Sequence, residues 1–275
     1  DAAWPTIAPA LPLFLTGPNP KLQTVCDALF RFLEFTGRWD ELVSLSRQAE
    51  AKAVAAGDYN NAGWRAYHAG RIHYLRQQAD EVLACAGRAA AHSQKAQAGA
   101  RERAFSIRLR GMGHQIRQDY PAAVAAYRES LALYRTLGAE SQDVAMGLNS
   151  LADAELGSGD FTAAERDYRE ALRMARAVGH AEGVAVYTGR LSELMLDTKN
   201  WSMAEALARE ALPLSENLGR KELIAANNRR LAQALVRQGK PVKGLPYAQR
   251  AVEIFAQLGA PRLVAAKVIL KESQS

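Results

Sequence analysis

The chain has 275 residues, of which 48% are apolar, and a formal net charge of +6. This composition can build a large core, and no stretch of sequence has the length or basic flank of a membrane anchor or a signal peptide. Cys26 and Cys85 fall at non-equivalent positions, which favours buried reduced thiols over a disulfide framework. We therefore expect a cytoplasmic protein.

Residues 1–20 form an apolar segment that is rich in proline. Trp4 and Phe14 could pack against the body of the protein, but the prolines break any long helix. We expect this segment to be an irregular lid or linker over the part of the chain that begins at residue 21.

A pattern then recurs six times at intervals of 40 or 41 residues, which is typical of a repeat protein. The residue that begins the second half of each unit is, in turn, Trp39, Ala79, Tyr120, Phe161, Trp201 and Pro241. Glycines at positions 57, 138, 179, 219 and 259 mark the unit ends in phase with these residues, and the second unit has Gln97 instead. The predicted repeats are 23–58, 59–98, 99–139, 140–180, 181–220 and 221–260.

Each repeat is predicted to form two antiparallel helices. In the fourth, Leu148, Leu151 and Leu156 form one apolar stripe, and the glycines at 157 and 159 end it before a second stripe begins. Small residues recur three positions after the anchor, where the two helices approach each other: Ala123, Ala164, Ala204 and Gly244. A last helix within residues 261–275 would cap the final apolar face.

The fourth unit resembles a tetratricopeptide repeat. Gly159, Asp160 and Phe161 match the G-D-Y positions of that family, Ala164, Tyr168 and Ala171 match its later A, Y/F and A positions, and Leu151 and Ala152 stand at its L-G pair. The resemblance extends over about residues 21–259 and implies an all-α, right-handed superhelical solenoid of about six hairpins plus the capping helix.

The period is longer than the 34 residues usual for the family, and in this it is similar to the repeats of bacterial NB-ARC or STAND signalling ATPases. A D-x-x-W stretch, Asp1 to Trp4, is similar to the segment that joins the nucleotide-binding and winged-helix part of those proteins to their repeats. We therefore expect a fragment of a longer polypeptide, with maturation by cleavage as the alternative.

The sequence contains no pattern that predicts catalysis or a cofactor. It has no glycine-rich phosphate loop, no H-E-x-x-H and no C-x-x-C. His73 and His114 occupy equivalent positions, followed by Glu155 in the next unit, but that position normally packs in the core, so we expect no metal. Arginines are spread over every repeat, which disfavours nucleic-acid binding because phosphate contacts require a gathered basic surface.

Function is therefore expected on the concave surface, which the first helix of each repeat lines in this superhelix. The candidate ligand-binding residues are Arg31, Tyr67, Arg71, Tyr74, Arg108, Met112, Gln115, Asn149, Asp153, Glu193, Arg229 and Gln233. The arginines and tyrosines at one end predict an anionic contact, with Arg71 and Arg108 exposed. The Asp153 and Glu193 pair predicts recognition of a basic segment. The alternative is that these residues are hydrated or paired within the groove.

We interpret the chain as a non-catalytic module that binds a protein, a peptide or a small ligand, as the sensor region of a larger STAND-type ATPase would. The alternative is a free-standing scaffold that assembles proteins.

Overall fold

The computed structural model describes residues 4–274, and all regular structure in that range is helical. Residues 1–3 of the expected N-terminal segment and Ser275 of the expected tail lie outside the described part. Within residues 4–274 no helix is long and apolar enough to cross a membrane. The chain divides into two compact units, residues 1–117 and 118–275. The boundary falls in the turn between the two helices of the third repeat.

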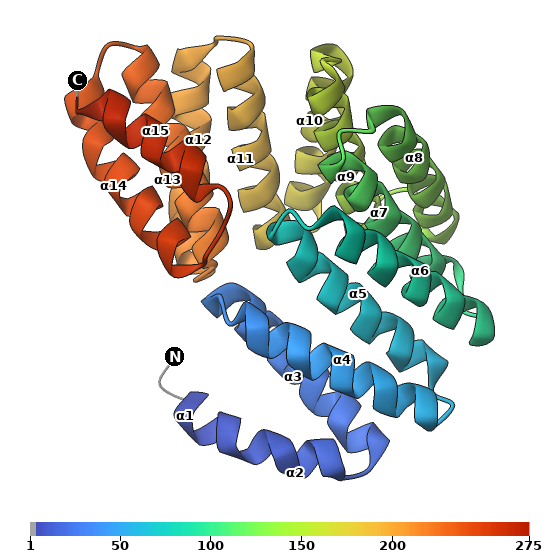
Figure 1. Ribbon diagram of the computed structural model, residues 1–275. Coiled ribbons are helices and arrows are strands. Elements are labelled where there is room, and N and C mark those ends of the chain that lie inside the picture. Colours follow the sequence, from blue (N-terminus) through green and yellow to red (C-terminus); the bar gives the residue numbers. More distant parts are fainter. Residues whose placement is uncertain (1–3, 275) are drawn as a thin grey trace. The chain divides into compact units, whose positions relative to one another are not determined.

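Unit 1 contains three short N-terminal segments and five longer helices (Figure 1). These are α1 (Trp4–Ile7), the 3-10 turn η1 (Ala8–Ala10), α2 (Leu11–Thr16), α3 (Asn19–Thr36), α4 (Trp39–Ala55), α5 (Tyr59–Leu75), α6 (Ala79–Lys95) and α7 (Ala100–Ile116). Successive helices from α3 to α7 pack against each other, and α5 also contacts α3 and α7.

Unit 2 contains eight further helices. They are α8 (Tyr120–Leu137), α9 (Gln142–Ser158), α10 (Phe161–Ala177), α11 (Ala181–Asp197), α12 (Trp201–Asn217), α13 (Lys221–Arg237), α14 (Pro241–Gln257) and α15 (Leu263–Ser273). Each helix packs on the next, and the first helices α9, α11, α13 and α15 also contact one another in series. The all-α array of helical hairpins predicted from the repeat is confirmed.

From the second repeat on, the first helix of a repeat is more deeply buried than the second, whereas in the first repeat α4 buries more residues than α3. Ten residues of α11 are buried, against four of α12. The reason is that α5, α11 and α13 each pack on their own partner and on both neighbouring first helices. Close approach between partners needs small side chains: Ala164 and Ala204 are fully buried, and a Cβ added to Gly244 would lie 3.1 Å from the carbonyl oxygen of Ala232.

The second helices begin at side-chain caps in the middle of the chain. Asp119, Asp160 and Asn200 each accept a hydrogen bond from the backbone N–H three residues later, which satisfies one of the free donors of the first turn. Asp160 is the Asp of the G-D-Y match, so that motif has a direct structural role. No such side-chain cap stands before α4, α6 or α14.

Both turns of a repeat use the left-handed backbone conformation. Before the second helices this residue is Gly37, Gln77, Gln118, Gly159, Lys199 and Gly239 in turn, with φ between 59° and 86°. At the repeat ends, Gln97 takes φ of 51° where Gly57, Gly179, Gly219 and Gly259 stand elsewhere. Gly138 differs, because its φ of 163° is extended rather than left-handed. The missing glycine in the second repeat therefore did not change the turn.

The N-terminal segment is folded against the first long helix in short pieces. Trp4 is buried, with its ring 6.0 Å from that of Phe32 and the guanidinium of Arg38 over it. Lys52 of α4 donates to the carbonyl oxygen of Leu15 at 2.6 Å. At the other end of the chain, α15 packs on α13 and α14 and buries Ala266 and Ile269.

Replacing Lys199 with glycine should stabilise the protein. A side chain at φ of 61° costs about 1–2 kcal/mol, which glycine avoids, although it adds chain entropy to the unfolded state. We expect a net gain of roughly 0.5–1 kcal/mol in the free energy of unfolding, measured by urea denaturation. Lys199→Ala is the matched control and should change little, since alanine carries the same strain. An equal gain in both variants would contradict the strain argument.

Candidate functional site

All of the candidate binding residues lie on first helices, as the repeat predicted. In unit 1 they are Arg31 on α3, Tyr67, Arg71 and Tyr74 on α5, and Arg108, Met112 and Gln115 on α7; in unit 2 they are Asn149 and Asp153 on α9, Glu193 on α11, and Arg229 and Gln233 on α13. Burial separates them. Arg31 is exposed, whereas Tyr67, Arg108 and Met112 are buried, and the others are partly exposed.

The expectation that Arg108 is exposed is therefore wrong. Its guanidinium donates to the hydroxyl of Tyr67 and lies over the rings of Tyr67 and Phe105, at 5.7 and 5.9 Å from their centroids. Only 6% of Arg108 is accessible. The reason is that α7 packs closely on α5, so a side chain on the stripe between them is covered by its neighbour.

Arg71 is partly exposed, but it is also engaged within the protein. It donates to the buried carboxylate of Glu34 on α3 at 2.5 Å and lies over the ring of Phe30. Arg65, fully buried on the same helix, donates to Asp27 of α3. Both arginines thus link α5 to α3. Their guanidinium groups are held in place by these bonds.

A group of aromatic side chains on α3, α5 and α7 was missed by the sequence analysis. Phe30 stacks on His68 with centroids 3.7 Å apart, and Trp64 lies 4.8 Å from Phe105, over which Arg101 is placed. Phe105 follows Arg101 by four residues and Trp64 precedes His68 by four, so one helical stripe on each helix carried the signal. We call the set Phe30, Arg31, Trp64, Tyr67, His68, Arg71, Arg101, Phe105 and Arg108 the aromatic–arginine face.

His68 is neutral within this face. Burial, followed by the nearby charges of Arg65 and Arg71, lowers the pKa of His68 well below its ordinary value. Its Nδ1 atom is buried without a hydrogen-bond partner. The buried ring therefore packs between Phe30 and Trp64 and carries no charge at neutral pH.

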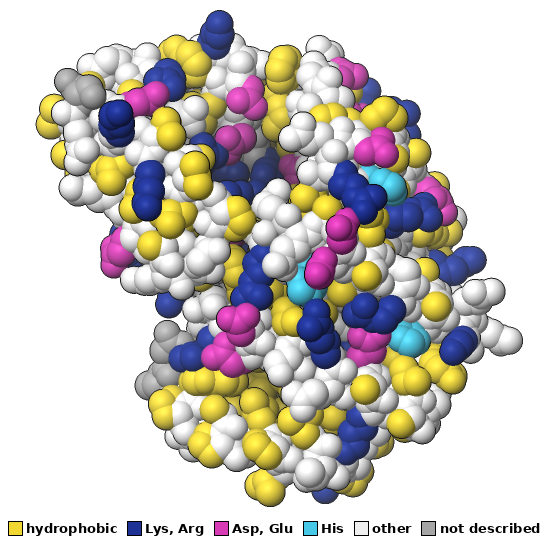
Figure 2. Space-filling model, viewed as in Figure 1, with side chains coloured by type: hydrophobic (Ala, Val, Ile, Leu, Met, Phe, Trp, Pro, Cys, Tyr) yellow, Lys and Arg dark blue, Asp and Glu magenta, His cyan; other side chains and the backbone are white. Residues whose placement is uncertain are grey.

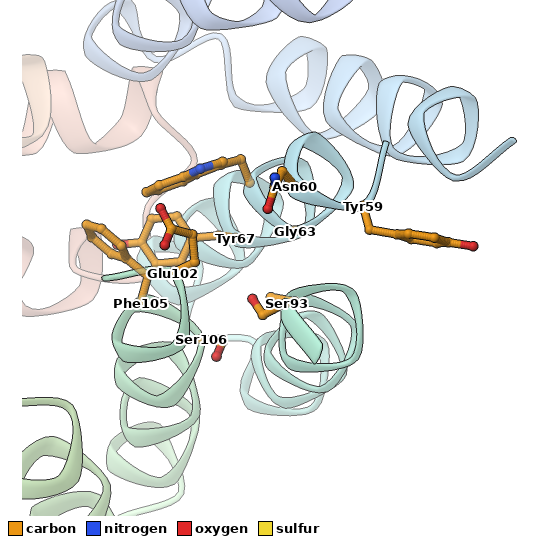
Figure 3. Close-up of a pocket in the computed structure, with 10 residues that line it drawn as sticks. Tyr59, Asn60, Gly63, Tyr67, Ser93, Glu102, Phe105 and Ser106 are labelled. Atoms are coloured by element: carbon orange, nitrogen blue, oxygen red, sulfur yellow. The ribbon is translucent and has the colours of Figure 1, made fainter. Parts of the chain in front are cut away.

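A small pocket lies beside the face, between α5, α6 and α7 (Figure 3). Figure 3 shows Tyr67, Glu102 and Phe105 gathered at one end, Ser93 and Ser106 on the walls formed by α6 and α7, and Tyr59 pointing away. Its volume of about 10 Å³ is room for one water molecule. A wider hollow of about 520 Å³ opens between α6 and α7 and is bordered by Gln94 and Arg103.

In unit 2 the acidic pair predicted to await a basic partner is already neutralised. Asp153 lies 3.2 Å from Arg190 of α11 and accepts from the hydroxyl of Tyr168 at 2.5 Å. Glu193 accepts from Arg229 and Arg230 of α13 at 2.5 to 2.7 Å. The alternative of pairing within the groove is the correct one here, because each first helix supplies the counter-charge for the one before it.

Arg230 and Asn227 of this network are buried, and Glu193 is partly exposed. Burial alone would raise the pKa of Glu193, but Arg229 and Arg230 hold it well below its ordinary value. Burial lowers the pKa of Arg230 to about 10 against the attraction of Glu193. Arg230 also donates to Asn227 at 2.8 Å, and a Cβ at Gly189 would come within 2.6 Å of the same Asn227 oxygen. Glycine at 189 is therefore what gives the pair its space.

Glu155, at the third of the equivalent positions that begin with His73 and His114, is a buried acid. Burial and then the charge of Asp167 raise the pKa of Glu155 to about 7, although Arg166 and Arg128 oppose this. His73 is buried too, with Nδ1 2.6 Å from the amide oxygen of Gln78, so it packs in the core as predicted. In the described residues no three His, Cys, Asp or Glu side chains are placed to hold a metal ion. Cys26 and Cys85 are buried and free, as predicted.

Basic side chains do not gather into one patch on the visible surface. Figure 2 shows lysines and arginines dispersed over it, with acidic side chains beside many of them. Several of these exposed pairs are within a helix, such as Arg169 with Glu165 and Arg250 with Glu253. This arrangement lacks the continuous basic track of a phosphate-binding surface.

The sequence model of the tetratricopeptide repeat family matches residues 101–177 and 143–217. Residues 101–217 of this chain therefore belong to the tetratricopeptide repeat family, and the helices on either side repeat the same hairpin fold. No curated protein matches the chain by sequence.

Three solved structures illustrate the similarity of fold. A STAND protein with a tetratricopeptide repeat sensor, PH0952 from Pyrococcus horikoshii, has a TM-score of 0.63 and 12% identity over 93% of this chain and 40% of its own. BtubC (BKLC) from P. vanneervenii has a TM-score of 0.60 and 18% identity over 80% of this chain and 92% of its own. A Rap protein complexed with Competence and Sporulation Factor has a TM-score of 0.62 and 12% identity, over 90% and 75%. These likenesses concern the fold.

Glu155→Gln should remove a pH dependence of stability. A carboxyl group whose pKa rises to about 7 on folding favours the folded state below its ordinary value of 4.5, and this contribution is lost as the pH rises to 7. The variant should be more stable than the parent by about 1–3 kcal/mol at pH 8 and show no such advantage at pH 4.5. The exposed Glu129→Gln on α8 is the control. Parallel pH profiles for Glu155→Gln and the parent would contradict the assignment.

Glu193→Gln should weaken unit 2, because it leaves buried Arg230 without its carboxylate. We expect the free energy of unfolding to fall by roughly 2–4 kcal/mol, since breaking a buried pair is costly. Glu253→Gln, which removes an exposed pair with Arg250, should cost less than about 1 kcal/mol. Denaturant unfolding compares the two, and equal losses would show that burial does not matter here.

Proposed function

We propose that the chain is a non-catalytic module that binds a protein or peptide along its first helices. One observation carries this proposal: the first helices present fixed, partly exposed charges and aromatic rings on regular stripes, as the aromatic–arginine face and the Glu193 network do. Side chains that are already ordered lose little entropy when a partner binds. A Rap protein of similar fold is complexed with Competence and Sporulation Factor, which supports the use of this fold for binding.

The finer proposal is that the module is the sensor region of a larger STAND-type signalling ATPase. It rests on the long repeat period and on the similarity in fold to the repeat sensor of the Pyrococcus horikoshii protein. An in-frame nucleotide-binding domain in the coding sequence before Asp1 would support it. A free-standing scaffold is the second candidate, favoured by one observation: the matched region spans 92% of BtubC.

Selection from a random peptide library on the immobilised full chain tests the module itself. We expect enriched peptides whose binding is lost when a negative charge is introduced on first helices, by Arg31→Glu, which reverses a charge, or by Gln233→Glu, which adds one. It should persist with Arg250→Glu or Arg209→Glu, whose side chains lie on the second helices α14 and α12. Failure to enrich any peptide, or equal loss in both groups of variants, would argue against first-helix binding.

A further inference from the structure

The first helices of unit 1 carry an excess of positive charge that the rest of the unit does not share. Together α3, α5 and α7 have eight Lys and Arg side chains and three Asp and Glu side chains. The second helices α4 and α6 have four basic and five acidic side chains. In unit 2 the first helices α9, α11 and α13 have five basic and seven acidic side chains. The positive excess is therefore confined to one layer of one unit.

Part of this charge lies on the aromatic–arginine face. Arg31 and Arg101 are exposed, and Arg71 is partly exposed, whereas Glu34 is buried beneath Arg71. The exposed carboxylate beside the face belongs to Asp27, and it is paired with Arg65. Because Glu34 is covered and Asp27 is neutralised by Arg65, the accessible guanidinium groups give the face a positive surface.

The aromatic side chains give the same face an apolar component. Trp64 is partly exposed beside the ring of Phe105, and His68 and Phe30 continue the ring surface toward α3. Neutral His68 adds no charge to it, and cations held over rings keep their apolar stems packed. A ligand that fits must therefore offer negative charge on both sides of an apolar group.

The size of the face indicates an extended chain. Arg31 and Arg101 lie on α3 and α7, with α5 between them and in contact with both helices. Two helix spacings amount to about 16–20 Å. Arg31 lies near the end of α3 and Arg101 at the start of α7, so the two are also offset by about 16 Å along the helix axes and lie roughly 23–26 Å apart. An extended peptide spans that distance with about seven residues. The adjacent pocket of about 10 Å³ has no room for a compact small molecule, and the wider hollow of about 520 Å³ is bordered by no residue of the aromatic–arginine face.

We propose that the aromatic–arginine face of unit 1 binds an acidic peptide segment, with carboxylates at Arg31 and Arg101 and an apolar side chain against Trp64. This inference rests on the proposed binding function and names the class of partner. A buried Arg108 holds Tyr67 and Phe105 in place below the peptide, and so it is a positioning residue rather than a contact.

The test uses the full chain and a fluorescein-labelled octapeptide of seven Glu and one central Phe. Two matched peptides replace every Glu with Gln or with Lys. We expect the Glu peptide to bind at least tenfold more tightly than the Gln peptide in fluorescence anisotropy at low salt, and the difference to shrink as salt is added. Equal affinity for the Glu and Gln peptides would overturn the proposal.

Variants localise the site. Arg31→Glu with Arg101→Glu should weaken binding of the Glu peptide at least tenfold. Arg103→Glu with Arg110→Glu is the matched control, because these exposed arginines lie on the opposite side of α7, and it should remain within twofold of the parent. Equal losses in both pairs would show nonspecific charge attraction and contradict the site.

The apolar contact is tested from both partners. Trp64→Ala should weaken binding of the Glu peptide at least fivefold, with circular dichroism as the check of folding. If that variant unfolds, replacing Phe with Gly in the peptide removes the same contact and should weaken binding by the same factor. An unchanged affinity for that peptide would contradict the apolar contact. If library selection instead enriches basic peptides that depend on unit 2, this inference fails while the binding function stands.

Discussion

Contact between one repeat and the next is the interaction on which each unit depends, because a helical hairpin cannot bury its apolar faces alone. The charged groups follow the same logic. An acid on one repeat pairs with an arginine about one period later: Asp27 with Arg65, Glu34 with Arg71, Glu50 with Arg88, Asp153 with Arg190, Glu193 with Arg229. The acid comes first in every one of these pairs. Each interface is thus completed by the next repeat along the chain.

This pairing explains why the first helices of the two units differ. In unit 2 the acids of α9 and α11 take up the arginines of α11 and α13, so charge is balanced within the layer. In unit 1 the same rule accounts for Arg65 and Arg71, but α7 brings four arginines and one glutamate. Of these arginines, Arg101 and Arg108 lie over aromatic rings, and Arg103 and Arg110 lie on the opposite side of α7. A nearly neutral network and a positive aromatic surface are suited to different partners.

Burying a charged side chain costs free energy, and at Glu155 no close counter-charge offsets this cost. Glu155 is buried with a raised pKa, and its Oε2 atom has no hydrogen-bond partner. Arg128 is the nearest cation recorded for it, at 3.9 Å, which is too long for a strong hydrogen bond. By contrast, Glu193 is held by two arginines at short distances. The ionised form is therefore disfavoured at Glu155 and favoured at Glu193, because only Glu193 has close arginine partners.

The sequence by itself determined the period, the hairpins and the layer in which the candidate residues lie. Small residues such as Ala164, the turn residue Gly159 and the cap Asp160 act through local geometry, and a repeat shows them many times. Even Gln97 could be placed, because its neighbours in the array impose the turn.

The tertiary structure alone decided which of those residues are accessible. The position of a residue on the helical stripe predicts that its side chain points toward the neighbouring first helices. Whether Arg108 reaches solvent or the hydroxyl of Tyr67 depends on how closely α5 and α7 pack. The same holds for Glu193, since its partners Arg229 and Arg230 lie a full repeat away in the sequence. Contacts at that separation are set by the stacking of helices, which no local pattern encodes, and they convert a predicted acidic patch into a neutral network.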